Sequence, residues 1–234
     1  MGSTSPSPLQ LHFLTLFPEA FSGPLSTSLL GKAQQKGLVS YHFTQIRDFA
    51  TDKHRTVDDT PYGGGEGMLM RADVLYAAWK SVVPEKSPDI LTVLLSPQGQ
   101  LFDQPMAKEF ANGKYQKIVL VCGHYEGVDE RFIELCVDCE ISIGNYILTG
   151  GEIAAAVIAD AVTRLVPRVV GNSDSLANDS LENGLLKYPQ FTRPPEFMGA
   201  KVPDVLLSGD HGKIAQWRQQ QSQQRTRKKR PDLN

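Results

Sequence analysis

Residues 90–127 read ILTVLLSPQGQLFDQPMAKEFANGKYQKIVLVCGHYEG, and this stretch decides the fold class. It contains two short apolar runs with the character of β-strands, Ile90–Leu95 and Lys117–Cys122, and each run ends in a turn that contains glycine. Between them, Gln104–Asn112 has the apolar spacing of a helix. Strand, helix and strand in this order predict a parallel βαβ unit.

The same alternation continues on both sides of this unit. Further strands are predicted at the apolar runs Leu11–Leu16, Val39–Ile46 and Ile141–Leu148. Further helices are predicted at Pro24–Lys36, Ala72–Val82, Val128–Val137 and Glu152–Val166, the last of which stops before Pro167. We therefore expect an α/β fold with a parallel sheet.

Composition excludes several classes of protein. The chain has 234 residues, of which 41% are hydrophobic and 21% charged, so wholesale disorder is excluded. No apolar run approaches the roughly 18 residues that span a bilayer, and Met1–Gln10 lacks the basic and apolar regions of a secretory signal. The chain has three cysteines, and this odd number is more typical of a protein with reduced thiols than of a disulfide framework. We expect a cytoplasmic protein without a membrane segment.

A polar segment divides the chain. Residues 171–184 are rich in Asn, Ser, Asp and Gly and poor in apolar side chains, which predicts a flexible linker. The boundary near residue 170 separates a first domain, residues 11–170, from a small second domain, residues 185–234. Beyond the linker the chain is interrupted by proline until Lys213 and is then predicted to be helical.

The C-terminal end is basic. Lys213–Asn234 contains seven Lys or Arg and one Asp, a net charge of +6, although the whole chain carries −2. Such an end suits contact with a polyanion. A solvated, poorly ordered tail has the same composition, and composition does not separate the two.

Three successive predicted strands end in glycine-bearing turns, at Ser96–Gly99, Gly123–Gly127 and Leu148–Glu152. Ligands of parallel sheets bind outside the carboxyl ends of the strands, where glycine lets backbone approach closely. Any one of these glycines could serve only a tight turn. Together the three turns favour a small-molecule pocket.

The spacing excludes two common ligand classes. The sequence contains no G-x-G-x-x-G that opens a βαβ unit and no G-x-x-x-x-G-K-[ST]. Neither a dinucleotide nor a nucleotide bound by a P-loop is therefore indicated as the ligand. Another glycine cluster, Pro61–Met68, has no Lys to meet phosphates. It is either a flexible substrate loop or a wide turn.

Cys136-x-x-Cys139 suggests a metal site, and His124-x-Glu126, ten residues earlier, resembles half of the H-x-E and P-C-x-x-C signature of zinc nucleobase deaminases. No Pro precedes Cys136, and the two halves are too close in sequence for a strand and helix to return between them. Two thiols also leave a structural zinc short of ligands. We therefore interpret both cysteines as helix residues and name no metal-ligating residue.

Two polar residues near the linker have ordinary structural explanations. Arg164 follows Asp160 by four positions and would form an i,i+4 ion pair. Asp179 lies in Asn178-Asp179-Ser180, the context of a helix N-cap. The residues alone do not separate these roles from catalysis.

Motifs along nearly the whole chain nevertheless resemble one family, the bacterial tRNA (guanine-N1)-methyltransferases, or TrmD family, of the SPOUT superfamily. The similarity extends from about Leu11 to Leu233. Among the stretches that carry it are Leu16–Glu19, Val57–Met68, Leu95–Gly99, Gly123–Arg131, Ser142–Glu152, Asp160–Leu165, Asp179-Ser180, Tyr188–Pro194 and Leu207–His211.

The resemblance implies a methyl transfer from S-adenosylmethionine to N1 of the guanosine immediately 3′ of the anticodon in tRNA. It also implies a deep trefoil knot in the C-terminal half of the first domain, a mainly helical C-terminal domain that binds tRNA, and a homodimer with composite active sites. The implied cofactor pocket falls on the three glycine turns, at Leu95, Ser96, Pro97, Gly99, Gly123, Tyr125, Glu126, Gly127, Ile143, Gly144, Tyr146, Leu148, Gly150 and Gly151.

The family mechanism assigns roles to the two polar residues near the linker. N1 of guanine carries a proton at neutral pH, and Asp179 matches the proposed general base. Loss of that proton places negative charge on O6, and Arg164 matches the cation proposed to stabilise it. Glu126 matches the pocket carboxylate nearest to the cationic cofactor.

The chain departs from the family pattern at a few positions. Asn145 stands where many members have Asp, and Asn178 where many have a further acid. Mg²⁺ is associated with this reaction, and these changes weaken any assignment of its ligands. Arg168 replaces a residue that is often small. The alternative function is a non-catalytic RNA-binding protein on the same fold, against which Asp179, Arg164 and the intact glycine turns argue.

Overall fold

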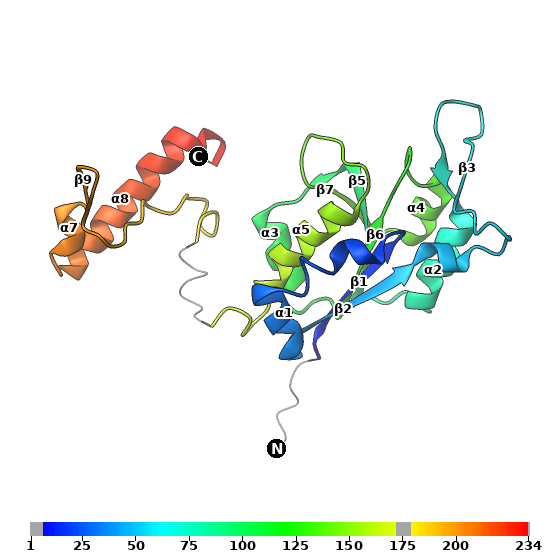
Figure 1. Cartoon of the computed structure of the whole chain (residues 1–234), viewed down its shortest axis with the longest axis horizontal. Helices are drawn as coiled ribbons and strands as arrows, with labels where there is room; N and C mark the ends of the chain where they lie inside the picture. Colours follow the sequence, from blue (N-terminus) through cyan, green and yellow to red (C-terminus); the bar gives the residue numbers. More distant parts are fainter. Residues whose placement is uncertain (1–6, 172–178, 234) are drawn as a thin grey trace, which may run out of the picture. The chain divides into compact units, whose positions relative to one another are not determined.

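The computed structural model describes residues 7–171 and 179–233. The chain divides into two compact units, the first ending at Gly171 and the second occupying the remainder of the chain. Figure 1 shows the elements of each unit, which are described separately below.

The first unit is built on a five-stranded parallel sheet. Its strands are β1 (Leu9–Thr15), β2 (Val39–Gln45), β5 (Ile90–Leu101), β6 (Lys117–Cys122) and β7 (Cys139–Ser142). They are arranged in the order β2-β1-β6-β5-β7, and every neighbouring pair is parallel. This confirms the predicted α/β class with a parallel sheet.

Alternate residues of the central strands enter two separate cores. In β6, Ile118 and Leu120 pack in one cluster, whereas Val119 and Val121 pack in the other, and all four are fully buried. Strands buried on both faces become continuous apolar runs in the sequence, which is why these runs were recognisable.

Helices cover both faces of the sheet (Figure 1). The helices α1 (Ser28–Gln35), α3 (Gln104–Ala111) and α5 (Glu152–Thr163) contribute to one core, and α2 (Ala72–Val82) and α4 (Glu130–Cys136) to the other. The chain moves across the sheet in one direction over the first face and in the opposite direction over the second. All its crossovers between parallel strands therefore share one hand, as expected for such sheets.

Short elements complete the first unit. Two 3₁₀ turns, η1 (Pro18–Phe21) and η2 (Ile46–Phe49), follow β1 and β2, and a small hairpin pairs β3 (Asp58–Asp59) with β4 (Leu69–Met70). Met70 also bridges to Val128, so the hairpin is attached near the carboxyl end of β6.

Several predicted boundaries were wrong. The strand predicted at Ile141–Leu148 ends at Ser142, because residues 143–151 form bends and irregular backbone instead. Conversely, β5 continues past Leu95 to Leu101, with a register shift against β7 between Leu95 and Gln100. Cys136 lies in α4 as predicted, but Cys139 begins β7 rather than belonging to the helix.

The second unit contains the hairpin β8 (Glu196–Phe197) and β9 (Ala200–Lys201), the helices α7 (Asp204–Leu207) and α8 (His211–Lys229), and η3 (Pro231–Leu233). Asp210 caps α8, since its side chain accepts the backbone N–H of Lys213. The predicted basic helix is thus confirmed. Within residues 179–233, Thr226 is the one buried side chain, and no hydrophobic side chain is fully buried.

Candidate active site

The three glycine turns meet at the carboxyl end of the sheet. They surround a cavity of about 420 Å³, within the range of small-molecule sites. Thirteen of the fourteen residues implied by the resemblance line it, and Gly99 does not. The lining residues of this set are Leu95, Ser96, Pro97, Gly123, Tyr125, Glu126, Gly127, Ile143, Gly144, Tyr146, Leu148, Gly150 and Gly151.

Two of these glycines lie where backbone approaches closely. The N–H of Gly151 donates to the carbonyl of Gly123 at 3.0 Å, and a Cβ on Gly151 would lie 2.7 Å from Cα of Cys122. A Cβ on Gly150 would lie 2.2 Å from Cε1 of His124. Because any side chain would force these segments apart, glycine at both positions fixes the turn before α5 against the end of β6.

Gly99 has a different reason for being glycine. It lies in the extended part of β5, where a Cβ would come within 2.3 Å of the backbone of Glu140 and Ile141. The residue therefore allows β5 and β7 to pack closely, and it is not part of the cavity wall. Its assignment to the cofactor site by sequence resemblance finds no support in the lining.

Acidic side chains distinguish this cavity. Glu126, Glu130 and Glu140 contribute to its lining, and none of the described residues that line it is Lys or Arg. Such a wall suits a cationic ligand and disfavours a polyphosphate. Of the three carboxylates, sequence reasoning found Glu126 alone. Glu130 and Glu140 lie outside the glycine turns, on α4 and β7, so only the packing of these elements identifies them.

The second glycine cluster of the sequence contacts this site. The N–H of Glu126 donates to the carbonyl of Met68 at 3.0 Å, and a Cβ on Gly67 would lie 2.3 Å from Cγ of Glu126. The Pro61–Met68 loop also helps to form a broad groove of about 760 Å³, beside which the side chain of Tyr62 is fully exposed. The loop is thus packed beside the cavity, and its substrate role stays a prediction.

Arg164 lies at the C-terminal end of α5, where its N–H donates to the carbonyl of Asp160 at 3.1 Å. It does not line the cavity. Asp179 belongs to the second unit, and its Oδ1 lies 3.2 Å from Nζ of Lys187. The helix-cap interpretation of Asp179 is wrong, because the residues that follow form a turn closed by the N–H of Glu182. Asn178 lies outside the described residues.

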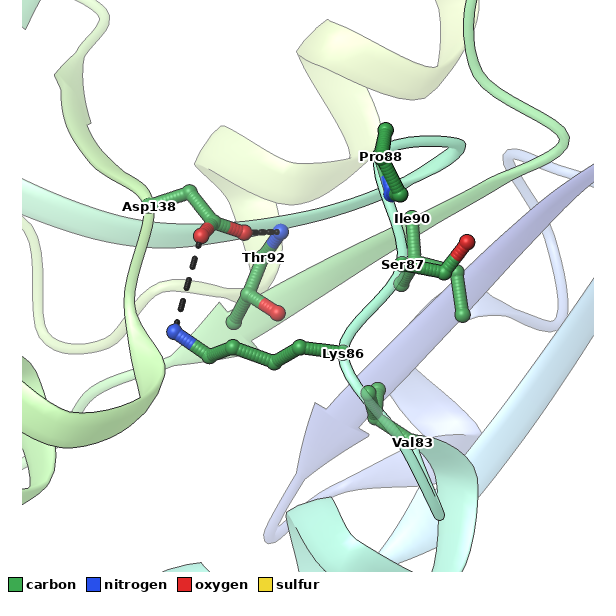
Figure 2. A pocket seen from close by; sticks show the side chains of 7 residues that line it. All are labelled: Val83, Lys86, Ser87, Pro88, Ile90, Thr92 and Asp138. Atoms are coloured by element: carbon green, nitrogen blue, oxygen red, sulfur yellow. Dashed lines mark hydrogen bonds and ion pairs between the residues drawn. The ribbon is translucent and has the colours of Figure 1, made fainter.

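A second, smaller pocket lies at the opposite end of β5 (Figure 2). Its volume is about 200 Å³, and Asp138 points into it to accept the N–H of Thr92 at 2.7 Å and to approach Nζ of Lys86 at 3.7 Å. These contacts satisfy the carboxylate and tie β7 to β5. Its other polar side chains also have partners, since the hydroxyl of Ser87 donates to Asp89 and that of Thr92 accepts from the indole N–H of Trp79. We therefore assign this pocket a structural role.

The cysteines are not arranged for metal binding or nucleophilic chemistry. Burial raises the pKa of the Cys122 thiol well above its ordinary range, and burial together with Asp138 raises that of Cys139 to about 11. Both thiols are therefore protonated at neutral pH. Within residues 7–171 and 179–233, no group of three or more His, Cys, Asp or Glu side chains is placed to hold a metal ion.

The chain is similar to known proteins over nearly its whole length. Residues 9–234 match the family described as tRNA (Guanine-1)-methyltransferase TrmD. The chain belongs to this family. Three relatives named tRNA (guanine-N(1)-)-methyltransferase come from Brevibacillus brevis, Chloroflexus aggregans and Pelotomaculum thermopropionicum, with 52%, 52% and 53% identity. Each alignment covers 96% of this chain and 91%, 87% and 89% of the respective relative.

Membership of this family favours an enzyme over a non-catalytic RNA-binding protein, because the relatives are named for a methyl transfer. Methyltransferases of the TrmD type use S-adenosylmethionine as methyl donor, and a cavity with an acidic wall suits that cation. Among the helices that the structure describes, none has the length and apolar character needed to cross a membrane.

Proposed function

We propose that this protein transfers a methyl group from S-adenosylmethionine to N1 of a guanosine in tRNA, the one immediately 3′ of the anticodon. The observation that carries the proposal is the cavity at the carboxyl ends of β5, β6 and β7, whose described lining holds three carboxylates and neither Lys nor Arg. Because the proposed substrate is tRNA, we propose that the protein acts in the cytoplasm.

When bound, the cofactor supplies an electrophilic methyl group on a positively charged sulfur. The glycine turns bind and orient it, and Glu126 contributes negative charge beside it. Asp179 takes the N1 proton of guanine, so that the N1 lone pair forms the new N–C bond while the S–C bond breaks and its electron pair returns to sulfur. Arg164 stabilises the negative charge that develops on O6.

The ion pair of Asp179 supports a defined position for its side chain. Lys187 places an ammonium group 3.2 Å from the carboxylate and restrains it. Both side chains are only partly exposed, at 24% for Lys187 and 29% for Asp179, so water weakens the attraction only in part.

Composite active sites in a homodimer form the second part of the proposal. Arg164 belongs to the first unit and Asp179 to the second. The second unit also has no fully buried hydrophobic side chain among residues 179–233, and it exposes Phe197 by 67% and Met198 by 89%. So small a unit gains little stability from its own core, which supports docking against a partner subunit and tRNA.

The fold proposal includes a trefoil knot at the end of the first unit. Its support is the family resemblance together with the close packing of the turn before α5, where Gly151 lies against Cys122. We also propose residues 11–170 as the knotted methyltransferase domain, residues 171–184 as the linker and residues 185–234 as the tRNA-binding domain. Leu181 donates its N–H to the carbonyl of Leu185, so the described end of the linker packs within the second unit.

A magnesium ion is not assigned to this site. The described residues bring together no group of three metal-ligating side chains, and Asn145 carries an amide where a carboxylate would favour the ion. No step of the proposed mechanism depends on Mg²⁺.

The test is a methyl-transfer assay on unmodified tRNA, with the nucleoside product identified by mass and chromatography. We expect 1-methylguanosine at the position 3′ of the anticodon and no product on a tRNA with adenosine there. A protein that binds this tRNA and S-adenosylmethionine yet yields no methylated nucleoside would be the non-catalytic alternative.

A further inference from the structure

One charged side chain of the first unit is buried without belonging to the proposed chemistry. Glu152 is 7% exposed, and it is the sole charged residue that is buried among residues 7–171 and 179–233. Burial of a carboxylate is unfavourable unless partners replace its water. Its partners therefore indicate what the charge is for.

Three hydrogen bonds satisfy the carboxylate. The hydroxyl of Thr15 donates to Oε1 at 2.6 Å, and Nε2 of His124 lies 2.8 Å from Oε2 and 3.0 Å from Oε1. Burial raises the pKa of Glu152, but the bonds from His124 and Thr15 outweigh it and hold that pKa below the ordinary 4.5. Glu152 is therefore ionised at neutral pH, in the first turn of α5, where the helix dipole favours negative charge.

These partners come from three separate segments. Thr15 ends β1, His124 belongs to the turn after β6, and Glu152 begins α5. The imidazole fills the space that a side chain at Gly150 would need, and the ring of Phe17 meets it edge-on with centroids 5.1 Å apart. The cluster therefore fastens two of the three cavity turns to the end of the sheet.

The turn that carries His124 needs such support. The next residue, Tyr125, has a φ of 61°, a left-handed conformation that a non-glycine residue adopts only when its surroundings enforce it. On one side, Met68 accepts the N–H of Glu126 at 3.0 Å. On the other side, the side chain of His124 is held by Glu152.

We infer that His124 and Glu152 are positioning residues for the cofactor, which hold Tyr125, Glu126 and Gly127 in the conformation that binds it. His124 lines the cavity and Glu152 does not, and neither has a role in the methyl-transfer step proposed above. This inference rests on the proposed function, because it takes the cavity as the S-adenosylmethionine site.

The test measures S-adenosylmethionine binding to the full-length protein by calorimetry and the kinetic constants of methyl transfer. His124→Ala removes the imidazole and leaves a space of its size. We expect the dissociation constant to rise about tenfold or more, the scale observed when outer supports of metal sites are removed, while KM for tRNA stays unchanged. Added imidazole should restore part of the affinity in this variant and have no effect on the wild type.

Two further variants distinguish loss of the contact between His124 and Glu152 from a general loss of folding. Glu152→Gln keeps the size of the side chain but offers one acceptor oxygen where the structure uses two, so we expect a rise of roughly threefold or more. His42→Ala, at an exposed position of β2, removes an imidazole away from the cluster and should leave affinity unchanged. Circular dichroism checks that each variant folds.

The outcomes separate this inference from the proposed function. A wild-type protein that fails to bind S-adenosylmethionine would contradict the proposed function. If the wild type binds, a folded His124→Ala variant with affinity within twofold of it would overturn the inference alone. Loss of affinity that imidazole does not restore, or an equal loss in His42→Ala, would also overturn it, because the effect would then not come from the imidazole–carboxylate contact.

Discussion

Single residues of this protein carry both its chemistry and its sensitivity to pH. Asp179 and Lys187 form a partly exposed ion pair in the second unit, whereas Glu152 and His124 form a largely buried hydrogen-bonded pair in the first. The buried pair anchors the backbone of two turns, while the other pair leaves the carboxylate of Asp179 partly exposed, as its proposed role as a base requires.

The proposed base can be tested by a substitution that preserves its shape. Asp179→Asn should lower the single-turnover rate of methyl transfer by at least about 10²-fold, the usual contribution of a positioned base. Cofactor affinity should be unchanged, because Asp179 does not line the cavity. Asp204→Asn, at an exposed acid of α7, is the matched control. A near-normal rate in Asp179→Asn would remove this residue from the mechanism.

His12 should make the fold sensitive to mild acid. Burial, with the nearby His42 and Lys117, lowers its pKa from 6.5 to about 4, and its Nδ1 has no hydrogen-bond partner. The unfolded chain therefore takes up the proton first, so stability is complete above pH 6.5 and declines as pH falls toward 4. We expect a loss of about 2 kcal/mol, allowing for partial exposure.

The measurement is the free energy of unfolding in urea between pH 7 and pH 4. His12→Gln cannot be protonated, so its stability should decline less over this range than that of the wild type. Parallel curves for the two proteins would show that His12 is not responsible.

At the scale of elements, β5 and β7 pair along the extension of β5 because their backbones approach closely at Gly99. β5 continues past the end of β6 and pairs again with β7 after its register shift, and Gly99 lies in this extension. Gly99→Ala should destabilise the protein by about 1–3 kcal/mol, since its Cβ would meet the backbone of β7. Denaturant unfolding measures the loss. Gly23→Ala, where nothing lies within 4 Å of the added Cβ, should be near neutral.

The helix α8 presents the proposed contact with tRNA phosphates. Arg227, Lys228 and Lys229 are exposed, whereas the neighbouring Thr226 is buried and its hydroxyl accepts the N–H of Leu186 at 2.8 Å. Truncation of this end would remove Thr226 and disturb the unit. Substitution of the three exposed cations is therefore the cleaner experiment.

Exchange of Arg227, Lys228 and Lys229 for Gln should weaken tRNA binding and flatten the slope of log K against log salt by up to about 2–3, because each phosphate contact releases counterions. Binding of S-adenosylmethionine should be unaffected. The control replaces the exposed Gln220, Gln223 and Gln224 with Ala on the same helix. An unchanged slope in the charge variant would show that these side chains are solvated and do not contact tRNA phosphates.

At the scale of the whole molecule, the proposed site needs two subunits. We expect that mixing Gly151→Trp, which blocks the cavity, with Asp179→Asn, which removes the base, restores activity after subunit exchange. A mixed dimer would hold one site with both changes and one with neither, because a two-fold dimer repeats a single interface.

The measurement is methyl transfer by the mixture relative to each variant alone. Mixed dimers of proven composition that stay inactive would place cavity and base in one chain. Sedimentation of the wild type as a monomer at assay concentrations would also contradict the composite site.

The sequence by itself determined the α/β class, most of the strands and helices of the first unit, and the turns that form the cavity. These followed from local properties: strands buried on both faces are continuous apolar runs, and turns against a neighbouring strand require glycine. Residue types also sufficed for the family, because its motifs occur in order along the chain.

Only the tertiary structure decided which distant residues meet. It separated Gly99 from the cavity, ended the strand after Ser142, and joined Thr15, His124 and Glu152 across 137 residues of chain. No local pattern encodes these contacts, since they depend on the order of strands in the sheet and on the face that each helix covers. The buried charge of Glu152 is stable for the same reason: its partners are brought to it by the fold and not by the neighbouring sequence.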